Sequence, residues 1–206
     1  MVSTIAPWAE PVPGVERRVT ADELLRWPDN PHDLWRYELV AGRLVRMSPT
    51  GFEHGEVTLN LSAPLHSFVK THRLGAVTAA ETGYLLSHPD EGDTVFAPDI
   101  AFISTSRLAN QPAQGTIERR SYLRVAPDLA IEVASPDQHR PEMAAKAQQY
   151  LAAGVQFVWI IWPGRREVDV WRSGSPEPIA TLKDDDRLAA PELLPGFDFR
   201  VADLFN

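Results

Sequence analysis

The chain has 206 residues, of which 44% are hydrophobic, and its formal net charge is -8 at pH 7. This length and hydrophobic content predict one substantial core and a single domain, and the acidic balance argues against a protein that coats nucleic acid non-specifically. The absence of cysteine excludes disulfides, thiolate-bound zinc and cysteine nucleophiles, and it fits a reducing compartment.

Residues 1–19 are predicted to form an extended, poorly ordered arm, because Pro7, Pro11 and Pro13 remove backbone donors and block a helix. This segment lacks a basic region followed by an apolar one, so it does not match a secretory signal. The longest strongly apolar run, at residues 157–162, is far shorter than the ~20 residues of a membrane span. We therefore expect a cytoplasmic protein with no membrane partner, whose single domain covers residues 20–206.

The first elements carry clear local signals. Thr20 followed by Glu23 has the spacing of a helix capping box and predicts a short helix over residues 20–27. The run YELVAGRLVRMS predicts two strands that turn at its Ala-Gly dipeptide. Apolar residues then recur close to the helical period over residues 51–71, which predicts the first long helix.

The rest of the chain alternates strands with one more helix. A helix is expected where Pro141 lies near the first turn and Gly154 lies beyond the end. The predicted strands, recognised by apolar runs with turn-rich borders, cover residues 76–87, 94–104, 128–135, 156–162 and 166–173. This order of elements predicts an α/β domain with a mixed sheet.

Glu132 stands in the middle of the strand DLAIEVAS, which has little other polar surface. An unpaired ionised carboxylate there would cost several kcal/mol or become protonated, so we expect a compensating partner. The segments VFAPDIAF and RVAPDLAI share an Ala-Pro-Asp turn followed by apolar residues. This repetition indicates that two neighbouring strands bring acidic groups to one region, with Asp99 beside Glu132.

Carboxylates on adjacent strands repel one another unless a cation or protons neutralise them, and their hard oxygens suit Mg²⁺ or Mn²⁺. Asp99 and Glu132 are therefore candidate metal ligands. Lys146 lies on the following helix, four residues from Tyr150 and so on the same face, where its ammonium group could hold a water or a phosphate oxygen. Such a set could direct metal-activated water at a phosphodiester. A purely structural ion-pair network of the same residues is the alternative.

Other common catalytic patterns are missing. The sequence contains no GxxxxGK[ST], GxGxxG, GxSxG or HExxH motif. Nucleotide triphosphate motors, dinucleotide enzymes, serine hydrolases and zinc hydrolases of that type therefore lack support.

The combined motifs resemble those of the Uma-two family of endonucleases, within the PD-(D/E)XK nuclease superfamily. The resemblance spans roughly residues 20–206. It depends on five features: YELVAGRLVRMSP with a following His54, FAPDIAFIS, APDLAIEVASPD, Lys146 before QYLAAGVQFVWII, and LLPGFDFRVADLF. It implies a restriction-endonuclease-like mixed sheet flanked by helices, with DNA as partner and, by superfamily habit, a homodimer.

The resemblance also assigns the site. Asp99 matches the superfamily's aspartate, and Glu132 matches the acidic residue of its second motif. The lysine expected two residues after that glutamate is replaced by Ala134, so the resemblance implies that Lys146 takes its place.

Two further residues match the opening of the family pattern. Glu38 corresponds to its acidic residue and His54 to its histidine at the start of the long helix. The implied Mg²⁺ (or Mn²⁺) ligands are then Glu38, Asp99 and Glu132. The alternatives are that Glu38 is a solvent-facing strand residue and that His54 caps the long helix or satisfies a core contact.

Substrate binding requires positive charge near the site. The loop over residues 104–124 is rich in arginine, and another arginine follows the Glu132 strand. We expect phosphate contacts from Arg119, Arg120 and Arg140. The alternative is a solvated loop on an acidic protein.

These observations predict a Mg²⁺-dependent DNA endonuclease in which Lys146 orients the attacking water. A catalytically degenerate nuclease fold that only binds nucleic acid or protein is the first alternative, favoured by Ala134. A metal-dependent hydrolase of a small phosphoester is the second.

Overall fold

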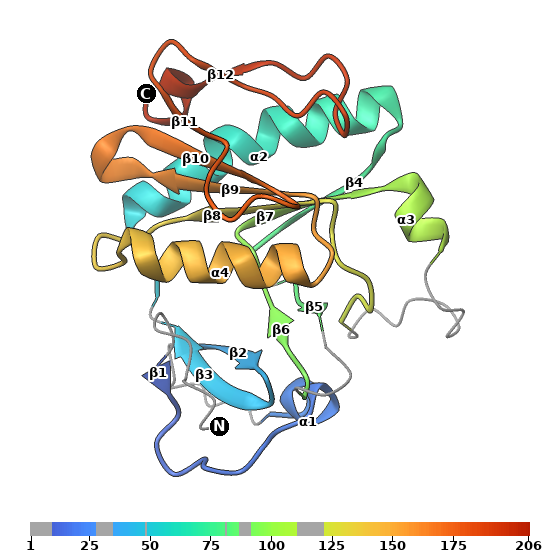
Figure 1. Cartoon of the computed structure of the whole chain (residues 1–206), viewed down its shortest axis with the longest axis vertical. Helices are drawn as coiled ribbons and strands as arrows, with labels where there is room; N and C mark the ends of the chain where they lie inside the picture. The colour runs from blue at the N-terminus through green and yellow to red at the C-terminus, as the bar shows by residue number, and fades with distance from the viewer. Residues whose placement is uncertain (1–9, 28–34, 48, 81, 87–91, 111–121) are drawn as a thin grey trace.

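A computed structural model describes residues 10–27, 35–47, 49–80, 82–86, 92–110 and 122–206. Its centre is a six-stranded sheet in the order β11-β10-β9-β8-β7-β4 (Figure 1). Strands β8 and β9 are parallel and the other neighbours are antiparallel, so the sheet is mixed, as predicted. The strands are β4 (Gly75–Ala79), β7 (Ile100–Ser104), β8 (Leu129–Val133), β9 (Phe157–Trp162), β10 (Glu167–Arg172) and β11 (Ala180–Lys183).

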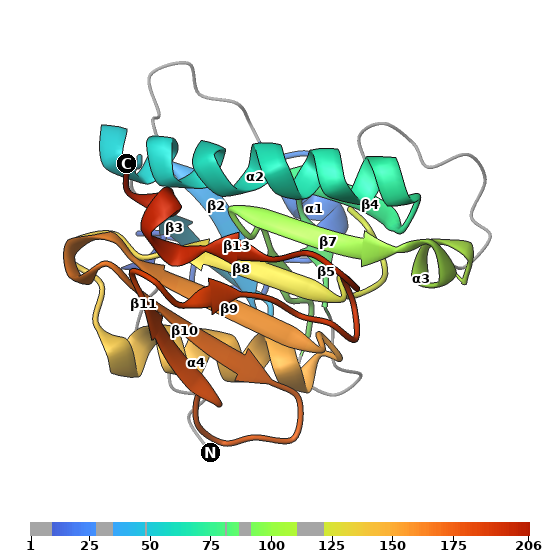
Figure 2. The same cartoon turned by 90° about the horizontal axis from the view of Figure 1, so that it is seen from above.

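Two long helices cover opposite faces of this sheet (Figures 1 and 2). Helix α2 (Phe52–His72) buries one apolar stripe against the first face, and α4 (Arg140–Ala152) connects the parallel strands β8 and β9 across the second face. A parallel pair requires a crossover connection of this kind. None of the helices in the described ranges combines the length and apolarity needed to cross a membrane.

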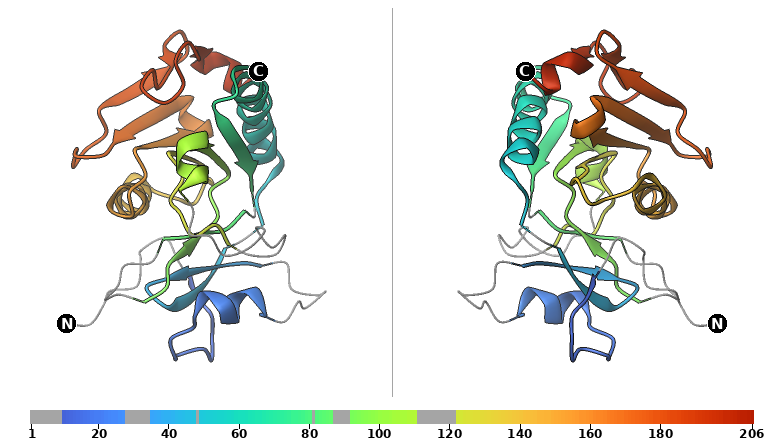
Figure 3. Two further views of the ribbon diagram at one scale, coloured as in Figure 1. Left: turned by 90° about the vertical axis from the view of Figure 1, so that its right-hand side faces the viewer. Right: turned by 90° about the vertical axis from the view of Figure 1, so that its left-hand side faces the viewer.

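A smaller sheet lies at one end of the molecule together with α1 (Ala21–Leu25) (Figure 3). Its order is β1-β3-β2-β6-β5. The predicted turn between β2 and β3 is confirmed, since Ala41 and Gly42 both have positive φ, of 51° and 75°, as a tight hairpin turn requires. The strands are β1 (Glu10–Pro11), β2 (Arg36–Val40), β3 (Arg43–Met47), β5 (Tyr84–Leu85) and β6 (Val95–Phe96).

The C-terminal segment packs on its own domain. The short strands β12 (Arg187–Leu188) and β13 (Phe199–Arg200) pair with each other, and η2 (Val201–Leu204) follows them. Leu194 and Phe197, from the LLPGFDF run, are buried in the same core as the apolar stripe of α2. The remaining short elements are α3 (Thr105–Ala109) and η1 (Pro163–Arg165).

The predicted N-terminal arm is wrong where the structure describes it. Strand β1 pairs with β3, and Val19 is buried in the core of the smaller sheet. Pro11 is compatible with this pairing because β1 is an edge strand, where a missing donor is tolerated. Residues 1–9 lie outside the described residues.

Candidate active site

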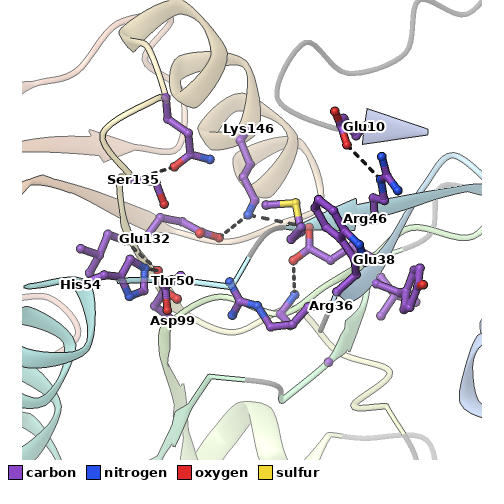
Figure 4. Close-up of a pocket in the computed structure, with 18 of the residues that line it drawn as sticks. Glu10, Arg36, Glu38, Arg46, Thr50, His54, Asp99, Glu132, Ser135 and Lys146 are labelled. Atoms are coloured by element: carbon purple, nitrogen blue, oxygen red, sulfur yellow. Dashed lines mark hydrogen bonds and ion pairs between the residues drawn. The ribbon is translucent and has the colours of Figure 1, made fainter. Parts of the chain in front are cut away.

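A cavity of about 480 Å³ lies between the two sheets. Its lining draws on β2 and β3 of the smaller sheet, on β8 and the residues before β7 in the central sheet, and on both long helices (Figure 4). The five residues predicted to be catalytic all line it: Glu38, His54, Asp99, Glu132 and Lys146. The sequence prediction that these residues converge is thus met by the fold.

Asp99 and Glu132 come together through the register of β7 and β8. Ile100 pairs with Ile131 in this antiparallel ladder, so Asp99, one position before, lies opposite Glu132. The backbone N–H of Val133 donates to Asp99 Oδ2 at 2.8 Å. Both carboxylates therefore enter the cavity from neighbouring strands.

The Ala-Pro-Asp repetition does not bring its two aspartates to one region, contrary to the prediction. Because β7 and β8 run in opposite directions, the second aspartate of the repetition, Asp128, lies at the far end of the strand pair. There it pairs with Arg107 and accepts a hydrogen bond from Gln156. Asp99 does lie beside Glu132, but the antiparallel register brings them together.

The partners that Glu132 requires come from α4. Its side chain is buried, Lys146 Nζ lies 2.9 Å from Oε1, and the Tyr150 hydroxyl donates to the same oxygen at 2.6 Å. The pKa of Glu132 is raised to about 7, chiefly by burial and also by the nearby Asp99 and Glu38 charges, against the opposing effects of Lys146 and Tyr150. The two α4 residues compensate the carboxylate only in part.

Lys146 is 2% exposed, although its side chain carries a charge. Burial alone lowers the pKa of an ammonium group, but the attraction of Glu132, Glu38 and Asp99 raises the pKa of Lys146 above its ordinary value. Lys146 Nζ also lies 3.8 Å from Glu38 Oε2. The lysine is therefore a permanent cation among the acidic groups.

Glu38 projects from β2 into the same space. Its Oε1 accepts a hydrogen bond from the Ala97 N–H at 2.9 Å, whereas its buried Oε2 accepts none. Three carboxylates thus face one ammonium group. The cavity holds an excess of negative charge, and Glu38 Oε2 is a buried carboxylate oxygen without a hydrogen-bond donor.

His54 lies in the first turn of α2 and holds Asp99 from the other side. Its Nε2 is 3.0 Å from Asp99 Oδ2, the oxygen that also accepts from Val133. This pair of contacts fixes the orientation of the Asp99 carboxylate.

The donors fit a hard divalent cation. Within the described ranges, no three His, Asp or Glu side chains form a ready-made metal cluster. Mg²⁺ does not require one, because it commonly binds through one or two carboxylates and completes its shell with water and substrate oxygens. Asp99 and Glu132, with the donor-free Oε2 of Glu38 in the same cavity, offer that arrangement and the negative charge to match it.

The predicted substrate contact of Arg140 is wrong. Its guanidinium group binds the buried Asp169 through both carboxylate oxygens and also pairs with Glu167, and Arg140 does not line the cavity. Two carboxylates of β10 therefore already neutralise the charge of Arg140. Arg119 and Arg120 lie outside the described residues.

Sequence reasoning missed Arg36, which lines the cavity beside Glu38. The signal was available, since alternate residues of a strand share a face and Arg36 is two residues from Glu38. Tyr150, which shares the α4 face of Lys146, donates its hydrogen bond to Glu132.

Comparisons with known proteins identify the family of the chain. The chain is similar to a crystal structure described as a putative nuclease belonging to DUF820 from Anabaena variabilis ATCC 29413, with 26% identity over 91% of this chain and 97% of that one, and a TM-score of 0.70. No curated protein gives a significant match. A family model, Uma2, described as "Putative restriction endonuclease", matches residues 21–202. The chain therefore belongs to the Uma2 family, whose description assigns it to the nucleases.

Proposed function

We propose that the protein is a Mg²⁺-dependent endonuclease that hydrolyses phosphodiester bonds of DNA. The observation that carries this proposal is the 2.9 Å contact between Lys146 and Glu132, made from α4 although position 134, where the superfamily lysine is expected, is Ala134. Membership of a nuclease family and the fit of the carboxylates to a hard cation support it.

Asp99 and Glu132, with Glu38 beside them, would hold Mg²⁺, which when bound lowers the pKa of water and offsets phosphate charge. Side chains of the protein supply the remaining functions of the site. Lys146 donates hydrogen bonds to the attacking water or to a phosphate oxygen and stabilises the negative charge that develops there. His54 and Tyr150 hold the Asp99 and Glu132 carboxylates in position.

The test compares two single substitutions. Lys146→Ala should remove most cleavage of plasmid DNA and leave Mn²⁺ affinity nearly intact, because the ammonium group is not a metal ligand. Glu132→Gln should weaken Mn²⁺ binding, since it deletes ligand charge. Cleavage is followed on gels, Mn²⁺ affinity by calorimetry and stability by thermal unfolding. Lys70→Ala, at an exposed position of α2, is the matched control and should behave as the parent.

A structural ion-pair network predicts the reverse order. In that case Lys146→Ala would leave buried carboxylates without a cation and destabilise the fold by ~3 kcal/mol or more, and Glu132→Gln would be milder. A folded Lys146→Ala protein that cuts at the parent rate contradicts the proposed role of the lysine.

Ala134 favours a second candidate function, a nuclease fold that binds nucleic acid or protein without cleaving it. Calorimetry separates the two, because a pure binding module has no need for a divalent cation. A parent protein that neither binds Mn²⁺ nor cuts DNA would favour the binding module.

A further inference from the structure

Arg36 enters the cavity from the same strand face as Glu38. The register of β2 with β3 places Arg36 opposite Met47 and Glu38 opposite Val45. Tyr37 and Leu39 alternate with them and pack on the other face, in the core formed with α1. Figure 4 shows the Arg36 side chain directed into the cavity between the carboxylates.

The other cationic groups of the cavity already have partners. Lys146 binds Glu132, and His54 binds Asp99. Arg46 pairs with Glu10 at 2.9 Å and lies 4.3 Å from the Trp35 ring centroid. Among the described residues that line the cavity, Arg36 is the arginine with no hydrogen bond, ion pair or ring contact.

A guanidinium group without a partner is informative where carboxylates are abundant. Five carboxylate residues line the cavity with Arg36, namely Glu10, Glu38, Asp99, Glu132 and Asp137. Arg36 forms an ion pair with none of them, although Glu38 Oε2 lacks a hydrogen-bond donor. The cavity therefore presents one guanidinium group without a partner and one buried carboxylate oxygen without a hydrogen-bond donor, whose nearest cation, Lys146 Nζ, lies 3.8 Å away. A cation or a proton would neutralise the Glu38 carboxylate, and an anion would neutralise the Arg36 guanidinium group.

We propose that Arg36 binds a backbone phosphate of a nucleic acid strand in the cavity; the identity of the strand rests on the proposed function. A guanidinium fork matches two oxygens of one phosphate, and it gives geometric control that an ammonium group lacks. The site otherwise repels a phosphate through its excess of carboxylates. Arg36 offsets that repulsion and sets the position of the phosphate relative to Asp99 and Glu132.

The experiment measures binding rather than cleavage. A fluorescein-labelled single-stranded DNA oligonucleotide is titrated with protein, in EDTA and again in Ca²⁺, and its anisotropy is followed over a range of salt concentrations. Arg36→Gln should weaken affinity about tenfold, the effect of one charge-assisted phosphate contact. The slope of log K against log salt should fall by about 0.7 because one phosphate contact is lost.

Two further variants sharpen the result. Arg43→Gln is the matched control: it removes the same charge from the same hairpin at an exposed position that does not line the cavity, and it should keep the parent affinity and slope. Arg36→Lys keeps the charge without the fork, so it should keep the parent slope with intermediate affinity. Thermal unfolding checks that all variants are folded.

The inference is overturned if Arg36→Gln binds as tightly as the parent with the parent salt slope, or if it changes no more than Arg43→Gln. A parent protein that does not bind the oligonucleotide overturns it as well. If the parent binds, Arg36→Gln loses affinity, and neither protein cuts DNA, then the phosphate contact stands and the proposed hydrolysis fails. The two proposals can therefore fail separately.

Discussion

Glu132 has both of its donors on one oxygen. Lys146 and the Tyr150 hydroxyl reach Oε1, and no residue of the described ranges donates to Oε2. The carboxylate is therefore held on the α4 side, and its second oxygen is left for a ligand. Burial, together with the nearby Asp99 and Glu38 charges, raises the pKa of Glu132 to about 7 despite Lys146 and Tyr150, so the group changes protonation state near neutral pH.

The raised pKa predicts the pH dependence of stability in metal-free protein. The folded-state pKa of about 7 lies above the ordinary value of 4.5, so between these values the folded protein holds a proton that the unfolded chain releases. The free energy of unfolding should therefore fall as pH rises from 4.5 to 7, by up to about 3 kcal/mol.

Urea unfolding in EDTA, carried out at several values across this pH range, measures the effect. Glu132→Gln cannot titrate and should lose less stability over the same range, and the other acidic groups are common to both proteins. Equal pH slopes for parent and variant would show that Glu132 does not titrate in this window.

Residue types and spacing pointed to Asp99, Glu132 and Lys146, and the family resemblance added Glu38 and His54; all five line the cavity. The sequence could not supply contacts made across the fold. Arg140 was expected to contact the substrate because it follows the Glu132 strand. No local sequence pattern indicates that its partner is Asp169 on β10. Asp128 carries the same Ala-Pro-Asp signal as Asp99, yet the antiparallel register separates them. Arg36 shares the face of Glu38, and its lack of a partner is visible only in three dimensions.

At the scale of elements, Arg140 fastens the start of α4 to β10. Its Nη1 donates to both oxygens of Asp169, at 2.8 and 2.7 Å. Asp169 also accepts hydrogen bonds from Trp162 Nε1 and the Thr181 hydroxyl, so one buried carboxylate links α4 with three neighbouring strands. The helix held in this way carries Lys146 less than two turns further on.

This anchor predicts that Arg140→Gln lowers stability without weakening nucleic acid binding. The loss should be about 1–3 kcal/mol, because Asp169 keeps two of its donors. Chemical unfolding gives the stability, and anisotropy of the labelled oligonucleotide gives the affinity. Unchanged stability together with reduced affinity would instead restore Arg140 as a substrate contact.

The long elements were predictable, but the division of the predicted strands between the two sheets was not. Helices α2 and α4 have apolar periodicity or terminal signals, and the β2–β3 hairpin has its turn residues. Strands β5 and β6 lie inside the strands predicted over residues 76–87 and 94–104, but the structure divides each of these segments between the two sheets. Strand β1 has two residues, too few to show a period, and its pairing with β3 defines it. Tertiary contacts therefore determine the part of the fold that supplies one wall of the cavity.

Across the whole molecule, the site lies where the two sheets meet. Glu38 comes from the smaller sheet, whereas Asp99, Glu132 and Lys146 belong to the central sheet and its helix. A cation bound here would contact the folded arrangement and not the unfolded chain. Its binding free energy would therefore add to the stability of the entire domain.

This linkage predicts that Mn²⁺ raises the melting temperature. At a free concentration of about 100 times the dissociation constant, stabilisation of about 2.7 kcal/mol is expected, or roughly 5–10 °C for a domain of this size. Asp99→Asn should abolish most of the shift. Asp128→Asn is the matched control, because Asp128 is equally buried at the other end of the same strand pair and is occupied by Arg107. It should lower the melting temperature in EDTA and still show the full Mn²⁺ shift, whereas an Asp99→Asn protein stabilised as much as the parent would place the cation outside this cavity.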